Sequence, residues 1–116
     1  MTQEEKVQYW LEIANYDLDT AEAIELVRKY KEVIMPRLNN EAEVYMYGSY
    51  SKGTQRPESD IDVAVVVTSA GSEWFSLTKS LWHDVDKVSL LIEPVLIEKS
   101  HPSPLYEDVL QTGIAI

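Results

Sequence analysis

The chain has 116 residues, of which 45% are hydrophobic, so it is long enough for one compact domain with an apolar core. Its formal net charge of −10 argues against unaided binding to long nucleic acids, because Lys and Arg dominate such contacts. It has no Cys, which excludes disulfides and zinc–cysteine sites. No apolar run is long enough to span a bilayer and the N-terminus lacks a signal peptide, so we expect a cytoplasmic protein without membrane contact.

The first forty residues have the pattern of amphipathic helices. One apolar face follows the three-four spacing of a helix and consists of Val7, Trp10, Leu11, Ala14, Leu18 and Ala21. A second helix is predicted to begin at a capping box formed by Asp19 and Glu22, or at Thr20 instead. Whether the chain breaks between residues 15 and 20 stays open. The second helix should end between residues 36 and 40 and bury Ala23, Val27, Tyr30 and Ile34.

Strands and helices alternate in the rest of the sequence. Strands are predicted at residues 44–47, 61–67 and 88–97, and helices or helical turns at 50–55, 73–84 and 105–111. The β-branched run at 61–67 is typical of a central buried strand, whereas Pro94 should bend the last strand or place it at an edge. This order predicts an α/β (α+β) fold, with a small mixed sheet covered by helices.

Two carboxylates mark the most informative part of the sequence. Asp60 and Asp62 open the apolar run at 61–67, and the two-residue period of a strand places them on the same face. Such carboxylates repel each other unless a cation lies between them. This arrangement is what a Mg²⁺ site for phosphoryl or nucleotidyl transfer requires.

A Gly-Ser pair precedes these carboxylates. Gly48 and Ser49 end the predicted strand at 44–47, and a turn of this composition lets backbone N–H groups and a hydroxyl approach a triphosphate closely. Lys52 and Arg56 in the following polar segment add positive charge that phosphates need in an acidic chain. Either pair alone would be an ordinary solvated turn, but chance explains their combination and order poorly.

The segment Tyr-Gly-Ser-Tyr-Ser-Lys-Gly at 47–53, followed by Arg-Pro-Glu-Ser-Asp-Ile-Asp at 56–62, resembles the minimal nucleotidyltransferases of prokaryotes, in the DNA polymerase β superfamily. The resemblance implies a polymerase β-like nucleotidyltransferase domain at residues 21–116, preceded by a helical extension at 1–20. It implies transfer of a nucleoside monophosphate from a triphosphate, with ATP favoured, to a hydroxyl. It implies catalysis and Mg²⁺ binding by Asp60 and Asp62, and nucleotide binding by Gly48, Ser49, Ser51, Lys52 and Arg56.

A third carboxylate is expected in this family on the strand next to the Asp-x-Asp strand. The resemblance aligns that position with Ser89, which neither binds a metal well nor accepts a proton at neutral pH. Asp86 is a substitute in reach, whereas Glu93 would lie roughly 13 Å along an unbent strand from Ser89. An impaired enzyme, or a module that only binds nucleotide or a partner, is therefore the alternative to an active transferase.

Residues 7–23 resemble the opening helix of HEPN proteins, small helical proteins often encoded beside minimal nucleotidyltransferases in toxin–antitoxin pairs. This resemblance implies an antitoxin-like role with a Tyr hydroxyl of a HEPN partner as acceptor, and a small molecule such as an aminoglycoside is the alternative acceptor. The apolar face around Trp10 either packs on its own domain or mediates association. On the second interpretation we expect a homo-oligomer.

Overall fold

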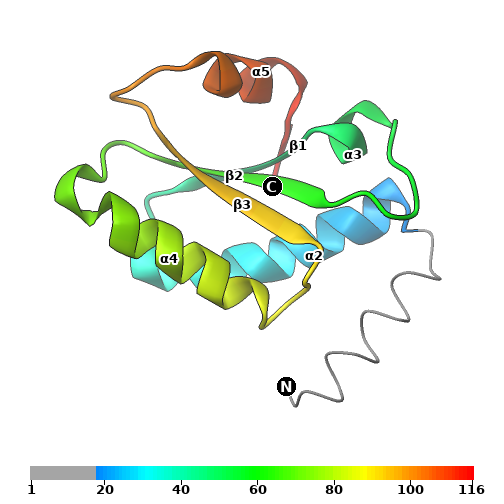
Figure 1. Cartoon of the computed structure of the whole chain (residues 1–116), viewed down its shortest axis with the longest axis horizontal. Helices are drawn as coiled ribbons and strands as arrows, with labels where there is room; N and C mark the ends of the chain where they lie inside the picture. Colours follow the sequence, from blue (N-terminus) through cyan, green and yellow to red (C-terminus); the bar gives the residue numbers. More distant parts are fainter. Residues whose placement is uncertain (1–17) are drawn as a thin grey trace.

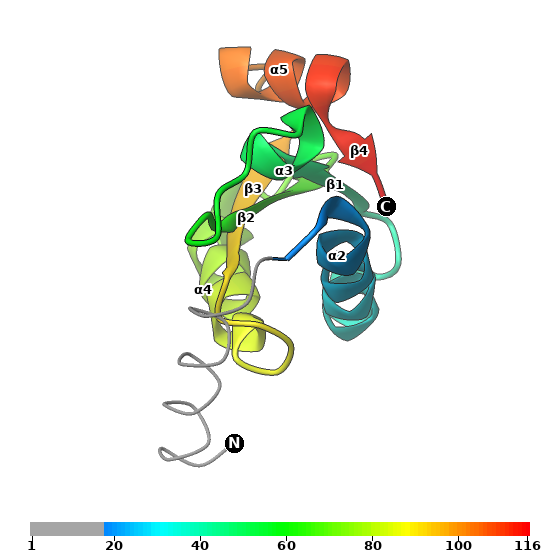
Figure 2. The same cartoon turned by 90° about the vertical axis from the view of Figure 1, so that its right-hand side faces the viewer.

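The computed structural model describes residues 18–116 and shows a four-stranded mixed sheet with helices on both faces (Figures 1 and 2). In chain order the elements are α2 (Thr20–Ile34), η1 (Met35–Leu38), β1 (Glu43–Tyr47), α3 (Ser49–Lys52), β2 (Ile61–Val67), η2 (Gly71–Glu73), α4 (Trp74–Val85), β3 (Ile92–Glu98), α5 (Pro104–Thr112) and β4 (Ile114–Ala115). This architecture confirms the fold class expected from the sequence. The amphipathic helix expected at residues 1–20 lies outside the described residues, except for its last three.

The strands lie in the order β3-β2-β1-β4. β2 runs antiparallel to β1 and parallel to β3, so it is the central strand that its β-branched sequence predicts. β3 lies at the edge of the sheet, and Pro94 in that strand pairs in register with Val63. An edge strand tolerates proline because one side of the strand has no ladder hydrogen bonds to lose.

Helices α2 and α4 cover one face of the sheet, and α5 covers the other (Figure 2). The capping box at the start of α2 is confirmed, because the Asp19 side chain accepts a hydrogen bond from the Glu22 N–H at 2.8 Å and the Glu22 carboxylate accepts one from the Asp19 N–H. The buried face of α2 is also the predicted one, with Ala23, Val27, Tyr30 and Ile34 inaccessible to solvent.

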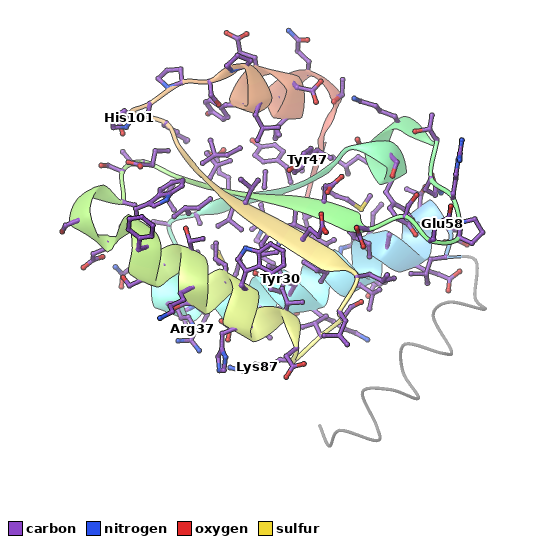
Figure 3. All side chains as sticks on the ribbon, viewed as in Figure 1. Tyr30, Arg37, Tyr47, Glu58, Lys87 and His101 are labelled. Atoms are coloured by element: carbon purple, nitrogen blue, oxygen red, sulfur yellow. The ribbon has the colours of Figure 1, made fainter. Side chains whose placement is uncertain are left out.

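A buried carboxylate joins α4 to η1, the short helix that follows α2. Asp84 is completely buried in α4, and its two oxygens accept hydrogen bonds from Arg37 at 2.7 and 3.1 Å. The Lys87 ammonium lies 2.9 Å from the same carboxylate (Figure 3). Burial alone would raise the pKa of Asp84, but the hydrogen bonds from Lys87 and Arg37 outweigh it and hold that pKa below its usual value. Asp84 therefore stays charged in the folded protein.

The third predicted strand begins later than the sequence pattern indicates. Residues 86–91 form a turn, in which the Ser89 N–H donates to the Val85 carbonyl at 3.0 Å, and β3 starts only at Ile92. Leu91 fills the core from this turn. No helix among residues 18–116 is long and apolar enough to cross a membrane.

Candidate active site

The Gly-Ser turn and the Asp-x-Asp segment lie side by side at one end of the sheet. Tyr47 at the end of β1 is the register partner of Asp62 at the start of β2. Gly48 has a φ of +75°, and a Cβ atom on it would lie only 2.3 Å from the Asp62 Oδ2 atom. Only glycine fits here, since any side chain would displace the carboxylate. The Gly-Ser turn therefore lies directly beside the Asp62 carboxylate.

Hydrogen bonds within the turn fix its shape. The Ser51 hydroxyl donates to the Gly48 carbonyl at 2.9 Å, and the Thr54 N–H donates to the Ser49 carbonyl at 3.0 Å. Ser51, expected to contact nucleotide, therefore has a structural bond within the turn. The Lys52 ammonium lies 3.8 Å from the Asp108 carboxylate of α5. Lys52 thus stands on the α5 side of the site.

Three carboxylates surround the start of β2. Asp62 is the register partner of Glu93 in the parallel β2–β3 pair, so both residues lie on the same face of the sheet. The pKa of Asp62 is raised by partial burial and by the negative charge of Asp60. The pKa of Glu93 is also raised, by desolvation, by a hydrogen bond shared with Asp60, and by repulsion from Asp60 and Asp62. The three groups, here called the acidic cluster, are therefore close enough to interact.

The position of Glu93 corrects the expectation that Ser89 replaces the third carboxylate. Ser89 lies in the turn before β3 and is only 1% exposed, and its hydroxyl accepts a hydrogen bond from the Leu91 N–H at 3.2 Å. The residue next to Asp62 on the neighbouring strand is Glu93. Glu93 is therefore not too far along the strand to take this place, because β3 begins only at Ile92 and Ser89 does not lie beside Asp62. Asp86 lies in the same turn and is likewise outside β3.

Tyr47 belongs to the same site, although sequence reasoning did not single it out. It lies between the sheet and α5 (Figure 3) and packs against the small apolar cluster that includes Val109. Burial, followed by the negative charges of Asp62, Glu93 and Asp108, raises its pKa to about 12. The Tyr47 hydroxyl therefore remains protonated at neutral pH and can donate a hydrogen bond.

Arg56 lies further from the sheet, in the polar segment between α3 and β2. This side chain is exposed, and a local turn forms around the residue, in which the Arg56 N–H donates to the Ser59 hydroxyl at 2.8 Å. The Ser59 N–H donates to the Arg56 carbonyl in return, at 2.9 Å. The turn precedes Asp60 directly, so Arg56 is carried on the segment that leads into the acidic cluster.

The donor set of the acidic cluster fits a hard cation. All its candidate donor atoms are carboxylate oxygens, which Mg²⁺ prefers. Desolvation first, and then repulsion between the carboxylates, raises the pKa values of Asp62 and Glu93, and a bound cation would offset that repulsion. Within residues 18–116, no three His, Cys, Asp or Glu side chains are arranged closely enough to enclose a metal ion by themselves. Mg²⁺ normally takes one or two carboxylates and completes its shell with water and phosphate. One or two carboxylates of the acidic cluster therefore fit this mode of Mg²⁺ binding.

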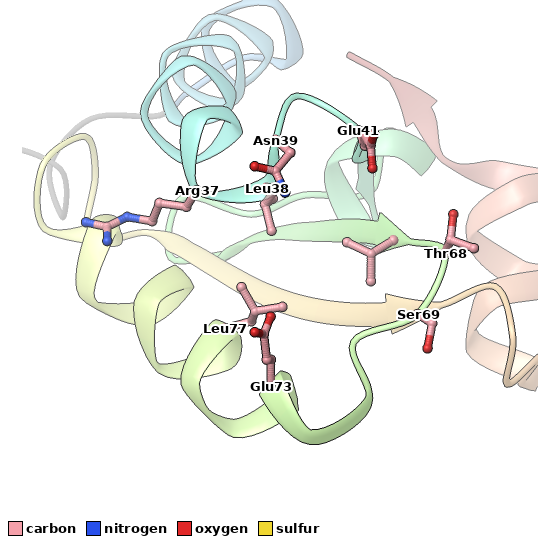
Figure 4. Close-up of a pocket in the computed structure, with 9 residues that line it drawn as sticks. Arg37, Leu38, Asn39, Glu41, Thr68, Ser69, Glu73 and Leu77 are labelled. Carbon is pink, nitrogen blue, oxygen red and sulfur yellow. The ribbon is translucent and has the colours of Figure 1, made fainter.

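A separate pocket of about 150 Å³ lies at the opposite end of β2 (Figure 4). Its lining includes Val67, Thr68 and Ser69 at the end of that strand, and Leu77 and Glu73 from the α4 side. The acidic cluster surrounds the start of the same strand. Since β2 spans seven residues, the pocket is about 20 Å from Asp62 and is not part of this site.

Comparison with known proteins identifies the family. A model of the nucleotidyltransferase domain matches residues 27–110, which is most of the chain. The chain belongs to the nucleotidyltransferase domain family. This assignment confirms the family resemblance and the enzyme class that the Gly-Ser and Asp-x-Asp motifs predict.

Two curated relatives come from Methanocaldococcus jannaschii and are described as candidate protein adenylyltransferases. One is 26% identical over 98 residues, covering 82% of this chain and 99% of the relative. The other is 29% identical over 94 residues, covering 81% of this chain and 93% of the relative. A solved structure from Sulfolobus solfataricus, described as a candidate nucleotidyltransferase, has a TM-score of 0.61 at 16% identity and covers 83% of this chain and 80% of that chain. The solved structure supports the nucleotidyltransferase fold.

Proposed function

We propose that the chain is a Mg²⁺-dependent adenylyltransferase that moves AMP from ATP to a hydroxyl of a protein. The observation that carries this proposal is the contact between Gly48 and Asp62, with Glu93 in register beside Asp62. This contact supports a metal-binding role for the acidic cluster, beside a turn suited to phosphates. Membership in the nucleotidyltransferase family supports the reaction type, and the relatives described as candidate protein adenylyltransferases favour ATP and a protein acceptor.

Each part of the site has a role in this proposal. One or two carboxylates of the acidic cluster (Asp60, Asp62 and Glu93) would hold Mg²⁺, which when bound neutralises phosphate charge and polarises the phosphoryl group that is transferred. The Gly48–Ser49 turn would present a hydroxyl and backbone N–H groups to the triphosphate. Lys52 and Arg56 would then add positive charge, and Ser51 would keep the turn in shape through its bond to the Gly48 carbonyl.

The proposed reaction is a single displacement. The oxygen of the acceptor hydroxyl forms a bond to the α-phosphorus of ATP, while the bond from that phosphorus to the bridging β-phosphate oxygen breaks. Pyrophosphate leaves with that electron pair, and the hydroxyl proton passes to a carboxylate of the acidic cluster. The contribution of the protein is to align the two reactants and to stabilise the charge that develops, as in other phosphoryl transfers.

For the acceptor, the proposal favours a Tyr of a HEPN protein, as in a toxin–antitoxin pair. It rests on the resemblance of residues 7–23 to a HEPN helix, and the relatives' description fits an acceptor that is a protein. A small-molecule hydroxyl is the other acceptor to test. A binding module without activity is the alternative that the position of Ser89 suggested, and the register of Glu93 beside Asp62 favours an active enzyme over it.

The direct test is transfer from labelled nucleotide. The full chain is incubated with Mg²⁺ and each of the four α-labelled triphosphates, with a purified HEPN protein from the same genome or with an aminoglycoside. We expect label from ATP on the HEPN protein, none after chelation of the metal, and none with Asp62→Asn. Glu58 is an exposed carboxylate in the loop before the cluster (Figure 3). Glu58→Gln is therefore the matched control and should transfer label at the normal rate.

Two outcomes would overturn the proposal. One is undiminished transfer by Asp62→Asn, which would place the reaction elsewhere on the molecule. The other is a complete lack of transfer from every triphosphate, together with no rise in melting temperature on addition of Mg²⁺ and ATP, because a ligand that binds the folded state must stabilise it.

A further inference from the structure

Helix α4 carries an exposed aromatic groove on the face away from the sheet. Phe75 is 84% exposed and Trp82 is 50% exposed. Their seven-residue spacing, close to two helical turns, places them on one side of the helix. Together with Ser76, Thr78 and Lys79 they line a groove of about 570 Å³. Exposed aromatic side chains gathered on one helix face are typical of surfaces that bind a partner helix.

The groove has a positive charge in an otherwise acidic protein. Lys79 lies between the two aromatic residues, and it also lines an adjoining hollow with His83. Packing of one α4 against the α4 of a second copy would bring the two Lys79 side chains together, which like-charge repulsion disfavours. The fitting occupant is instead an amphipathic segment that combines apolar residues with acidic ones.

The chain itself supplies such a segment. Residues 4–14 contain the apolar spacing Val7, Trp10, Leu11 and Ala14 together with the acidic residues Glu4, Glu5 and Glu12. We propose that the α4 groove binds the N-terminal segment, residues 4–14, of a second copy of this chain. In a two-fold dimer each copy would give its segment and receive the other. The segment's carboxylates would then lie near Lys79.

The geometry favours a second copy over the chain's own segment. The starts of α2 and α4 lie at opposite ends of the helical layer (Figure 1), and the helices meet where the Tyr30 hydroxyl donates to the Leu81 carbonyl at 2.7 Å. From this contact, about 15 Å of α2 leads back to Thr20 and about 9 Å of α4 leads back to Phe75. The N-terminal segment of the same chain would therefore have to cover roughly 24 Å from Thr20 to reach Phe75.

A helical segment of the same chain is too short for that span. If residues 7–18 form the helix that their spacing predicts, Val7 lies only about 16 Å from Leu18. It could not cover both aromatic residues of its own α4. In a reciprocal dimer this restriction disappears. The Trp10, Phe75 and Trp82 side chains of two copies would bury on the order of 1,000 Å², which is about the minimum for a biological interface.

The test measures the mass of the full chain in solution by light scattering. We expect a dimer for the unmodified chain and a monomer, half that mass, for Trp10→Ser and for Phe75→Ser. Leu110→Ser changes a residue that is 53% exposed on α5, away from the groove, and should stay dimeric as the matched control. Lys79→Glu should weaken the dimer by placing like charges together, and circular dichroism checks that each variant is folded.

Mixing the two monomeric variants gives the decisive result. The Trp10→Ser chain keeps an intact groove and the Phe75→Ser chain keeps an intact segment. The mixture therefore retains one of the two contacts, and it should associate more weakly than the unmodified dimer but measurably more than either variant alone. A monomeric unmodified chain would overturn the proposal, as would a dimer that survives Trp10→Ser, which would indicate α4–α4 packing. The readout is mass and not activity, so this test fails or succeeds independently of the proposed transferase reaction.

Discussion

Gly48→Ala should separate the stability of the domain from the function of the site. The new Cβ atom would lie 2.3 Å from the Asp62 Oδ2 atom, whereas ordinary contacts begin at 3.4 Å, so the carboxylate must move by about 1 Å. The backbone at Gly48, with φ +75° and ψ −146°, is also a conformation that essentially only glycine adopts. Rotation of the short Asp62 side chain can relieve the clash, but it removes the carboxylate from the acidic cluster.

The magnitudes follow from these two effects. Backbone strain of this kind costs about 1–3 kcal/mol, and each kcal/mol lowers the melting temperature of a domain of this size by roughly 4–8 °C. A displacement of about 1 Å at a reacting centre can cost about 100-fold in rate. We therefore expect Gly48→Ala to remain folded with a lowered melting temperature. We also expect it to lose most of its AMP transfer and most of the thermal shift caused by Mg²⁺ and ATP.

Gly53→Ala is the matched control. Gly53 also has a positive φ, +71°, but no atom lies within 4 Å of the position that its Cβ would take. This variant should show a smaller loss of stability, about 1–2 kcal/mol, since its backbone lies in the left-handed helical region. Its transfer activity should be nearly normal. If both variants lose activity equally, or if Gly48→Ala keeps full activity, the contact between Gly48 and Asp62 does not organise the site.

Three further substitutions test the acidic cluster and the buried carboxylate. Glu93→Gln should lower the rate of transfer about 10²–10⁴-fold, because an amide cannot accept the proton of the acceptor hydroxyl. Mg²⁺ and ATP should still raise the melting temperature of this variant. A normal rate would remove Glu93 from the mechanism. Ser89→Asp should not raise activity and should destabilise the fold by about 1–3 kcal/mol in urea titrations, because it puts a carboxylate at a position that is only 1% exposed. Increased transfer would restore Ser89 as the third position. Asp84→Asn should lower the free energy of unfolding by about 2–3 kcal/mol at neutral pH, because it breaks a buried ion pair. The loss is limited because the charged groups of Arg37 and Lys87, left without this partner, can still reach water. The lowered pKa of Asp84 means that its stabilisation is present above the pKa of the unfolded carboxyl, about 4, and is lost as the pH falls through the lower folded value. The urea midpoints of the two proteins should therefore converge in acid, and a constant difference would contradict this role for Asp84.

The elements that sequence analysis predicted well are those determined by local patterns. The capping box of Asp19 and Glu22 is a contact between residues three apart, so the sequence contains both partners. The burial of α2 follows from the 3.6-residue period of a helix, and the central position of β2 follows from its β-branched run. The proximity of Gly48 and Asp62 was also predictable. Gly48 directly follows one strand and Asp62 lies at the start of the next, and in an antiparallel pair these two strand ends lie side by side.

The buried ion pair was beyond such reasoning. Asp84 and Arg37 are far apart in the sequence, and nothing in the pattern around either residue distinguishes them from charges on a solvated helix face. Only the tertiary structure buries the Asp84 carboxylate of α4 and brings to it the Arg37 guanidinium of η1. The exposed groove of α4 has the same origin. The helix pattern predicts apolar contacts for Trp82. Only the tertiary structure shows that the core leaves Trp82 and Phe75 exposed.

The third carboxylate shows why spacing within one strand cannot locate a residue on another. Residues 88–91 are apolar enough to be taken for the start of a strand, but they form a turn from which Val88 and Leu91 pack into the core. In that turn the Ile92 N–H donates to the Ser89 carbonyl, and the Leu91 carbonyl accepts from the Ile61 N–H at 2.8 Å. The second bond sets where β3 begins relative to β2 and places Glu93 beside Asp62. A slip of one residue would turn Glu93 to the opposite face of the sheet, so the composition of the acidic cluster depends on this bond as much as on the carboxylates themselves.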